Sequence, residues 1–199
     1  MEPFKQAWKH FHAARRPMGW MLRNEGVPNW IRFHSLPQSK RYADTDEERA
    51  ILLARQNALA TEVLNVGPCW LVQTHWTTLP GEVDWADQHD PFWATREYGL
   101  EYAFEFLEED GADEDDPGGE PDRPWRVHAA PTDWSPGQFD HLLISIADEK
   151  AGSTLWMGTD GAIFAPYDGG IDLFLSGPEA VELLRSRHPG WLSDHPLGL

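Results

Sequence analysis

Residues 154–175 read TLWMGTDGAIFAPYDGGIDLFL, and this stretch decides the fold. Its apolar runs predict three short strands, Thr154–Met157, Ala162–Ala165 and Ile171–Leu175. Asp160-Gly161 lies in the first gap and is a strong hairpin signal, and Asp168-Gly169-Gly170 fills the second gap. Tight turns of this kind join antiparallel strands, whereas parallel strands need crossovers of a dozen or more residues. The stretch therefore predicts consecutive antiparallel strands.

The rest of the chain supplies further strands and helices on both sides of this stretch. Alternating or continuous apolar runs predict strands at Asn29–Leu36, Cys69–Trp76, Tyr98–Leu107 and Trp125–Ala130. Helices are predicted at Pro3–Ala14 and Asp46–Leu64, from Ser135 with Pro136 at its first position, and after Gly177-Pro178. Because the strands come in consecutive groups, we predict one α+β domain over residues 1–199, an antiparallel or mixed sheet packed against helices. Residues 15–28 are expected to be an N-terminal connection, and Thr77–Thr95 a long loop.

Helix periodicity also predicts which side chains face the core. Thr45 and Glu48 form a capping box at the start of the long helix. The predicted core-facing side chains are Phe4, Ala7, Trp8 and Phe11 in the first helix, Ile51, Leu52, Leu59, Val63 and Leu64 in the second, Phe139, Leu142, Leu143 and Ile146 in the third, and Val181, Leu183 and Leu184 in the last.

Charge is sorted along the chain. Residues 1–42 carry eight Lys or Arg against two acids, a balance of +6, although the whole chain has a formal charge of −17. Residues 43–199 therefore hold −23. Nine of their acids, and no base, lie in residues 108–122, which we predict to be a mobile acidic loop. Such a split suggests a partner or ligand recognised by charge, or two surfaces of opposite sign that attract each other. The overall charge makes nucleic acid an unlikely partner.

Composition also bears on the compartment. The single cysteine, Cys69, allows no internal disulfide and fits a reducing environment. The N-terminal residues have the pattern of an amphipathic helix, not of a secretory signal, and no window of the sequence approaches 18 apolar residues. We therefore expect a cytoplasmic protein that does not enter the membrane. The eleven Trp are spread along the whole chain, which favours packing roles over one aromatic platform.

The segment WIRFHSLPQSKRY, residues 30–42, is the densest polar and basic cluster. Arg32 is suited to bidentate contact with a carboxylate or phosphate, and His34 to proton transfer. Ser35 offers a hydroxyl, while Lys40 and Arg41 add positive charge. The cluster is a candidate site for an anion or an acidic partner. Alternatively, Lys40 and Arg41 are a solvated turn and Arg32 pairs with a downstream carboxylate.

The segment PYDGGID, residues 166–172, is the second cluster. Asp168 and Asp172 stand four apart around two glycines, next to Tyr167, and paired carboxylates can hold a divalent metal or share a proton. No third ligand can be nominated, so no metal site is predicted. The alternative is a hairpin turn with glycine at positive φ. A further possibility is that Arg32 or Arg41 bridges to Asp168 or Asp172.

Other motifs of known chemistry are missing from the sequence. It has no phosphate-binding glycine loop, dinucleotide fingerprint, GxSxG elbow, CxxC or HExxH, and the nine histidines are not spaced as metal ligands. No cofactor is predicted, and catalytic residues stay unknown.

Three segments resemble a family of uncharacterised bacterial proteins: RFHSLPQSKRY (32–42), PYDGGID (166–172) and the terminus HPGWLSDHPLGL (188–199). The YDGGID stretch is also similar to the signature of DUF3885-type domains of unknown function, with Gly169 standing where that signature has other residues. The resemblance implies a small bacterial cytosolic α+β domain. It implies no activity and transfers no catalytic residue.

Two functions follow as hypotheses. The first is a non-catalytic binding module, similar to an immunity protein, that presents an acidic surface to a basic protein partner. The second is an enzyme acting on a small anionic molecule, with Arg32, Lys40 and Arg41 holding it and His34 or the Asp168–Asp172 pair transferring protons. The second requires the two motifs, more than 120 residues apart, to meet in one pocket. The oligomeric state is not predicted.

Overall fold

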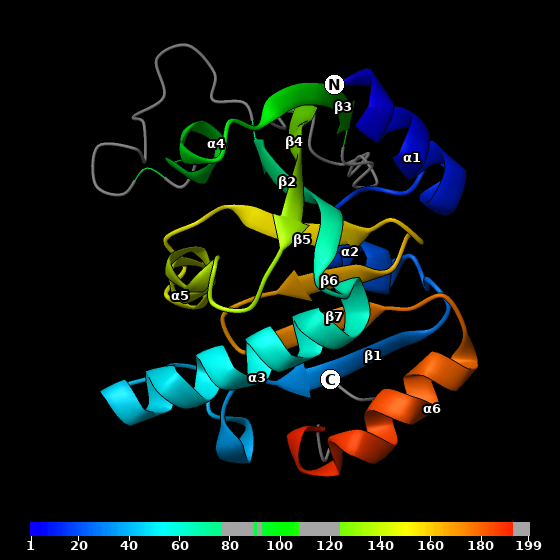
Figure 1. Ribbon diagram of the computed structural model, residues 1–199. Helices are drawn as coiled ribbons and strands as arrows, with labels where there is room; N and C mark the ends of the chain where they lie inside the picture. Colours follow the sequence, from blue (N-terminus) through cyan, green and yellow to red (C-terminus); the bar gives the residue numbers. More distant parts are fainter. Residues whose placement is uncertain (77–89, 91–92, 108–123, 193–199) are drawn as a thin grey trace, which may run out of the picture.

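One antiparallel sheet forms the centre of the molecule (Figure 1). The structure, a computed structural model, describes residues 1–76, 90, 93–107 and 124–192. In these residues seven strands form one sheet in the order β1-β7-β6-β5-β2-β4-β3, with every adjacent pair antiparallel. The strands are β1 (Trp30–His34), β2 (Gly67–Trp76), β3 (Glu101–Leu107), β4 (Pro124–Trp134), β5 (Ser153–Gly158), β6 (Ile163–Pro166) and β7 (Gly170–Phe174).

Helices cover both faces of this sheet. The α-helices of the described residues are α1 (Glu2–His12), α2 (Gly19–Asn24), α3 (Asp46–Leu64), α4 (Trp93–Glu97), α5 (Asp140–Ala147) and α6 (Pro178–Arg187). Two short 3₁₀ turns lie at Pro37–Ser39 and Pro189–Trp191. In Figure 1, α3 crosses in front of β6 and β7, whereas α2 lies behind the sheet. The arrangement confirms the predicted α+β class.

Each face has its own hydrophobic core. Leu59 of α3, Leu142 of α5 and Val181 of α6 pack on one face, while Phe4 of α1 and Leu22 of α2 pack on the other. Strand β7 contributes side chains to both cores because successive side chains of a strand point to opposite faces. Ile171 and Leu173 are part of the first core, and Phe174 is part of the second. Asp172 lies between Ile171 and Leu173, so its carboxylate points to the same face as Phe174, which is the α2 side of the sheet.

Two helices differ from their predicted course. The helix expected from Ser135 begins at Asp140, because Gly137 has φ +83° and its N–H donates to the Asn57 side chain at 2.8 Å. The four side chains expected on its buried face are all buried. In α3, Thr45 caps the Glu48 N–H at 3.2 Å as predicted, but the Glu48 carboxylate accepts from the Asp44 N–H instead of completing the box.

Three predicted core side chains are exposed. Ile51 is 37% exposed, because the buried stripe of α3 runs through Leu52 and Gln56. Leu183 is 48% exposed, since only Val181 and Leu184 of α6 face the sheet. Phe11 is 41% exposed and lies over the Gly161 turn rather than in the core.

The expected connection 15–28 contains a structural element. Its middle forms α2, which packs on the sheet through Met21 and Leu22. The predicted loop Thr77–Thr95 falls mostly outside the described residues, and its last part belongs to α4. The acidic loop 108–122 also lies outside the described residues. Among those described, no helix has the length and apolar character needed to cross a membrane.

Candidate functional site

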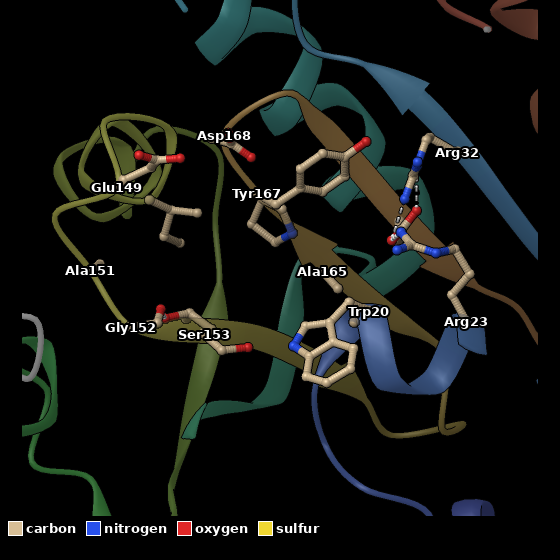
Figure 2. A pocket seen from close by; sticks show the side chains of 15 residues that line it. Trp20, Arg23, Arg32, Glu149, Ala151, Gly152, Ser153, Ala165, Tyr167 and Asp168 are labelled. Atoms are coloured by element: carbon tan, nitrogen blue, oxygen red, sulfur yellow. Dashed lines mark hydrogen bonds and ion pairs between the residues drawn. The ribbon is translucent and has the colours of Figure 1, made fainter. Parts of the chain in front are cut away.

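A cavity of about 460 Å³ opens on the α2 side of the sheet (Figure 2). Its walls come from α2 and α5, from β1, β5, β6 and β7, from the loop before β5, and from the β6–β7 turn. Arg32 belongs to the first predicted motif, and Tyr167, Asp168 and Asp172 to the second. The fold therefore brings Arg32 of the first motif and three residues of the second into one cavity, because antiparallel pairing of β1 with β7 places Arg32 opposite Asp172.

Asp172 is the buried centre of one wall. Its side chain is 2% exposed, and its carboxylate accepts four hydrogen bonds. Arg32 donates from Nε to Oδ1 at 2.8 Å and from Nη2 to Oδ2 at 3.1 Å, a bidentate fork. Arg23 donates from Nη1 to Oδ2 and Trp30 donates from Nε1 to Oδ1, both at 3.0 Å. The predicted bridge between the two motifs is thus present, with Arg23 as an additional partner.

These contacts fix the charge of the wall. Burial raises the pKa of the Asp172 carboxyl, and the charge and hydrogen bonds of Arg32 oppose that rise. All of the hydrogen-bond partners of Asp172 are N–H donors, so a proton on either oxygen would clash with a donor. The contacts therefore favour the ionised carboxylate. With Arg23 and Arg32 both cationic, the cluster carries one positive charge in excess.

Aromatic rings hold the Arg32 guanidinium in place. Its Cζ lies 4.9 Å from the centre of the Tyr167 ring and 5.6 Å from that of Trp30. The Tyr167 ring reaches this position by folding back over Gly170, where an added Cβ would lie 2.8 Å from the tyrosine oxygen and 2.4 Å from the Phe33 carbonyl oxygen. Neither Gly169 nor Gly170 has positive φ, so the glycines here supply space and not an unusual backbone conformation. Burial raises the pKa of Tyr167 well above its usual value.

The opposite wall carries acids. Asp168 accepts from Arg41 Nε, and the Tyr42 hydroxyl lies 3.4 Å from the same Oδ2 atom. Glu149 accepts from Arg41 Nη2 at 3.2 Å and from the Tyr42 hydroxyl at 3.1 Å. Arg41 is itself 60% exposed and does not line the cavity, and its hydrogen bond to Asp168 raises its pKa. Asp168 and Asp172 therefore bind different arginines: Asp168 binds Arg41, whereas Asp172 binds Arg32 and Arg23.

The remaining lining is aromatic, small or hydroxylic. Trp20 of α2 is 39% exposed, and Figure 2 shows its indole nitrogen on the side that faces Ser153. Gly19 allows α2 to approach β6 so closely that a Cβ on it would be 3.0 Å from the Ala165 Cβ. The other lining residues are Ile146, Ala151, Gly152, Thr154 and Pro166.

Three predicted site residues lie elsewhere. His34 lines a separate hollow of about 110 Å³ beside Trp191. Ser35 is fully buried and accepts a hydrogen bond from Gln56 Nε2 at 3.1 Å, which gives it a packing role. Lys40 pairs with Asp44 at 2.9 Å and with Glu48 at 2.5 Å near the start of α3, and the hydrogen bond to Glu48 raises the pKa of Lys40.

Sequence reasoning missed Trp20, Arg23 and Glu149. The helix that carries Trp20 and Arg23 has six residues between Pro17 and Pro28, too short for a periodic signal. The excess of basic residues in 1–42 did include Arg23, without indicating which of them would meet a carboxylate. Glu149 stands in a loop at φ 58°, where no motif marks it.

The cavity lining combines hydrogen-bond donors with aromatic surface. Two guanidiniums, an indole N–H and hydroxyls offer hydrogen bonds, and the rings offer flat apolar surface. Within the described residues, no group of three or more His, Cys, Asp or Glu side chains is placed to hold a metal ion.

Comparison with known proteins gives one match. The family model described as "Domain of unknown function (DUF3885)" matches residues 18–196. No curated protein and no solved structure matches the chain. The matched range includes α2 and both predicted motifs, and thus every lining residue of the cavity.

Proposed function

The chain belongs to the DUF3885 family of domains of unknown function, and from the cavity that this domain contains we propose that it is a non-catalytic binding module. Its ligand is a small, flat molecule that carries a carboxylate or phosphate group. The anionic group binds at the wall formed by Arg23 and Arg32, and the flat part lies between that wall and Trp20.

The observation that carries this proposal is the excess charge of the Arg23–Arg32–Asp172 cluster. Asp172 neutralises one of the two guanidiniums, and both arginines line the cavity. Arg23 uses Nη1 for Asp172, which is the one polar partner of its side chain among the described residues. The side chain is 24% exposed, so other N–H groups of the guanidinium remain available to an anion.

Aromatic and small side chains support the choice of a flat ligand. Trp20 supplies a partly exposed indole, and Tyr167 supplies a second ring whose orientation is fixed by Gly170 and Arg32. Ligand cavities of several hundred Å³ with a few fixed polar groups are typical of small-molecule sites. The acids Asp168 and Glu149 on the far wall disfavour a second anionic group on the ligand.

Catalysis is less well supported by the same geometry. Of the side chains considered for proton transfer, His34 lines another hollow, and Asp168 and Asp172 are both ion-paired with arginine. A general base must reach the proton that it removes and must be able to accept it, but N–H donors occupy both oxygens of Asp172, and Arg41 stabilises the charged form of Asp168.

Capture of a basic protein is a second proposal, favoured by the −23 balance of residues 43–199. Charge of one sign speeds encounter with a partner of the opposite sign and makes binding sensitive to salt. The expected result is a basic protein recovered from a host lysate at low salt and lost at high salt; recovery that ignores salt would count against it. The single buried thiol of Cys69 supports a cytoplasmic location for either function.

The ligand proposal is tested by a thermal-shift screen of aromatic and aliphatic carboxylates and phosphates. The screen compares the unchanged chain with Arg23→Gln and with Arg185→Gln, which changes an exposed arginine of α6 that does not line the cavity. Compounds with a flat ring and one anionic group should raise the melting temperature of the unchanged chain and of Arg185→Gln. Arg23→Gln should weaken binding about tenfold or more, because it removes a charged hydrogen bond.

Two results would overturn the proposal. One is a hit list in which uncharged or cationic compounds stabilise the chain as well as the anions do. The other is equal stabilisation of the Arg23→Gln variant and the unchanged chain, since the guanidinium would then play no part in binding.

A further inference from the structure

A second hollow, of about 580 Å³, lies between α1 and β3. We call it the basic groove. Its basic residues are Lys5 and Lys9 of α1 and Arg15 and Arg16 just after that helix, and its apolar residues include Trp8, Phe104 and Phe106. It shares no lining residue with the cavity on the α2 side, so the inference below does not rest on the proposed function.

Most of the positive charge of the basic groove is unpaired in the described part of the chain. Arg16 binds Glu25 at 2.6 Å, but Lys5, Lys9 and Arg15 form no ion pair with any described residue. The acid of the groove, Glu105, lies 3.8 Å from Arg126. On a chain with a charge of −17, three such cations along one hollow are a marked local excess.

The apolar part of the groove is a fixed surface. Trp8 is 2% exposed, and its Nε1 donates to the Arg15 carbonyl at 2.7 Å, which holds the segment after α1 against the helix. Phe104 stacks on Phe4 at 6.2 Å between ring centres, and Phe106 stacks on Trp125 at 6.5 Å. Phe104 and Phe106 remain half-buried, so apolar surface is left for a guest side chain.

We infer that the basic groove docks an acidic peptide segment of a partner protein. The partner's acids would pair with Lys5, Lys9 and Arg15, and one apolar side chain between them would pack against Phe104 and Phe106. Opposite charge supplies the attraction and the orientation, and the apolar contact supplies affinity.

Spacing sets the form of the peptide. Lys5 and Lys9 are one helical turn apart on α1, so their Cβ atoms are separated by about 6 Å. Alternate residues of an extended peptide project to the same side at intervals of about 7 Å. Acids at alternate positions of an extended segment therefore match the two lysines, and the bulky apolar residue belongs beside them.

Two other anionic partners fit less well. A membrane surface would need the apolar side of α1, but Phe4 and Trp8 are already buried in the core. An extended nucleic acid would bring an unbroken row of phosphates past Glu105, which lines the groove, whereas a peptide can place its acids at the lysines and an uncharged residue near Glu105.

The test uses the full chain and a fluorescein-labelled nonapeptide with Glu at alternate positions and a central Phe. Anisotropy is measured at low and at high salt, with a Lys-for-Glu peptide and a single-stranded oligonucleotide as comparison probes. The Glu peptide should bind saturably, and high salt should weaken it. Lys5→Glu/Lys9→Glu should weaken binding about tenfold or more through the reversal of two exposed contacts.

A control variant carries the same change of charge elsewhere. Lys150→Glu/Arg185→Glu alters two exposed side chains that do not line the groove, and it should bind the Glu peptide nearly as the unchanged chain does. The inference is overturned if both double variants weaken binding equally, if the oligonucleotide binds as tightly as the Glu peptide, or if the Lys peptide binds better.

Discussion

At the scale of single residues, Asp172 has the largest consequences. It is a carboxylate in a strand whose five residues are all buried, and it is tolerated there because two arginines and an indole saturate its oxygens. The same contacts give Arg32 a fixed position and leave Arg23 partly available. One buried acid thus both stabilises the β1–β7 pair and shapes the binding wall.

Replacement of Asp172 by Asn should destabilise the protein by about 3–5 kcal/mol, because two guanidiniums would lose their partner in a buried site. Asp168→Asn is the matched control: its partner Arg41 is 60% exposed, and such a pair contributes at most about 1 kcal/mol. Urea unfolding measures both. Equal losses in the two variants would show that Asp172 is not a buried ion-pair centre.

Gly170 is the second residue whose identity the structure explains. Gly170→Ala would place a Cβ 2.4 Å from the Phe33 carbonyl oxygen and beside Tyr167, so the β1–β7 pair must separate locally. A loss of about 1–3 kcal/mol is expected from such overpacking. Gly190→Ala, where an added Cβ meets nothing within 4 Å, should unfold at nearly the urea concentration of the unchanged chain. A Gly170 variant as stable as the Gly190 variant would refute the packing argument.

Some of these residue roles could be predicted from the sequence. A bridge between Arg32 and Asp172 was one of the possibilities that the two motifs raised, and antiparallel pairing of β1 with β7 realises it. Arg23 could not be predicted, because nothing in the sequence shows which of the basic residues of 1–42 points toward β7. Lys40 was expected near the anion site, but local acids at the start of α3 are closer to it.

At the scale of elements, turn chemistry was the most reliable guide. The Asp160-Gly161 and Asp168–Gly170 signals correctly predicted the antiparallel strands β5, β6 and β7. Short helices were the least predictable, because α2 and α4 have six and five residues and are held by tertiary contacts rather than by periodicity. The missed helix α2 is also the one that completes the cavity.

The β2–β4 pair contains a histidine stack that should make stability depend on pH. The ring centres of His75 and His128 lie 4.6 Å apart, and Tyr102 packs on His128. Besides burial, the nearby charge of Arg126 lowers the pKa of His75, whereas that of Asp90 raises it. Burial lowers the pKa of His75 from 6.5 to about 4. The unfolded chain therefore binds a proton that the folded chain rejects, so stability should fall as pH decreases from about 6.5 toward 4.

The measurement is the urea midpoint across this pH range for the unchanged chain, for His75→Gln and for His10→Gln. His75→Gln should flatten the dependence, whereas His10→Gln, which changes an exposed residue of α1, should retain it. A His75→Gln profile as steep as that of the unchanged chain would assign the acid sensitivity to other groups.

At the scale of the whole molecule, the single thiol reports on global unfolding. Cys69 is 4% exposed, and burial, with a contribution from Asp133, raises its pKa from 9.0 to about 12. At pH 8 the folded chain therefore holds a neutral, inaccessible thiol, and a disulfide reagent should label it only at the rate of unfolding. Rapid labelling without denaturant would mean that the structure around the start of β2 opens locally.

The molecule as a whole separates two kinds of surface. An acidic chain of −17 carries a polarised cavity on the α2 side of the sheet and a basic groove between α1 and β3. The composition predicted a ligand or partner recognised by charge, but not the position of its site. In the fold, the basic residues of 1–42 lie in three places: the cavity wall, the basic groove and the start of α3.

The most direct test of the binding proposal is an NMR titration of ¹⁵N-labelled protein with benzoate and, separately, with inorganic phosphate. The side-chain signals of the Trp20 indole N–H and the Arg23 and Arg32 Nε–H groups are followed. We expect saturable shifts of these signals with benzoate, smaller shifts with phosphate, and none with benzyl alcohol, which has the ring without the charge. If these signals stay in place while others move, or if benzyl alcohol shifts them equally, the cavity is not an anion-binding site.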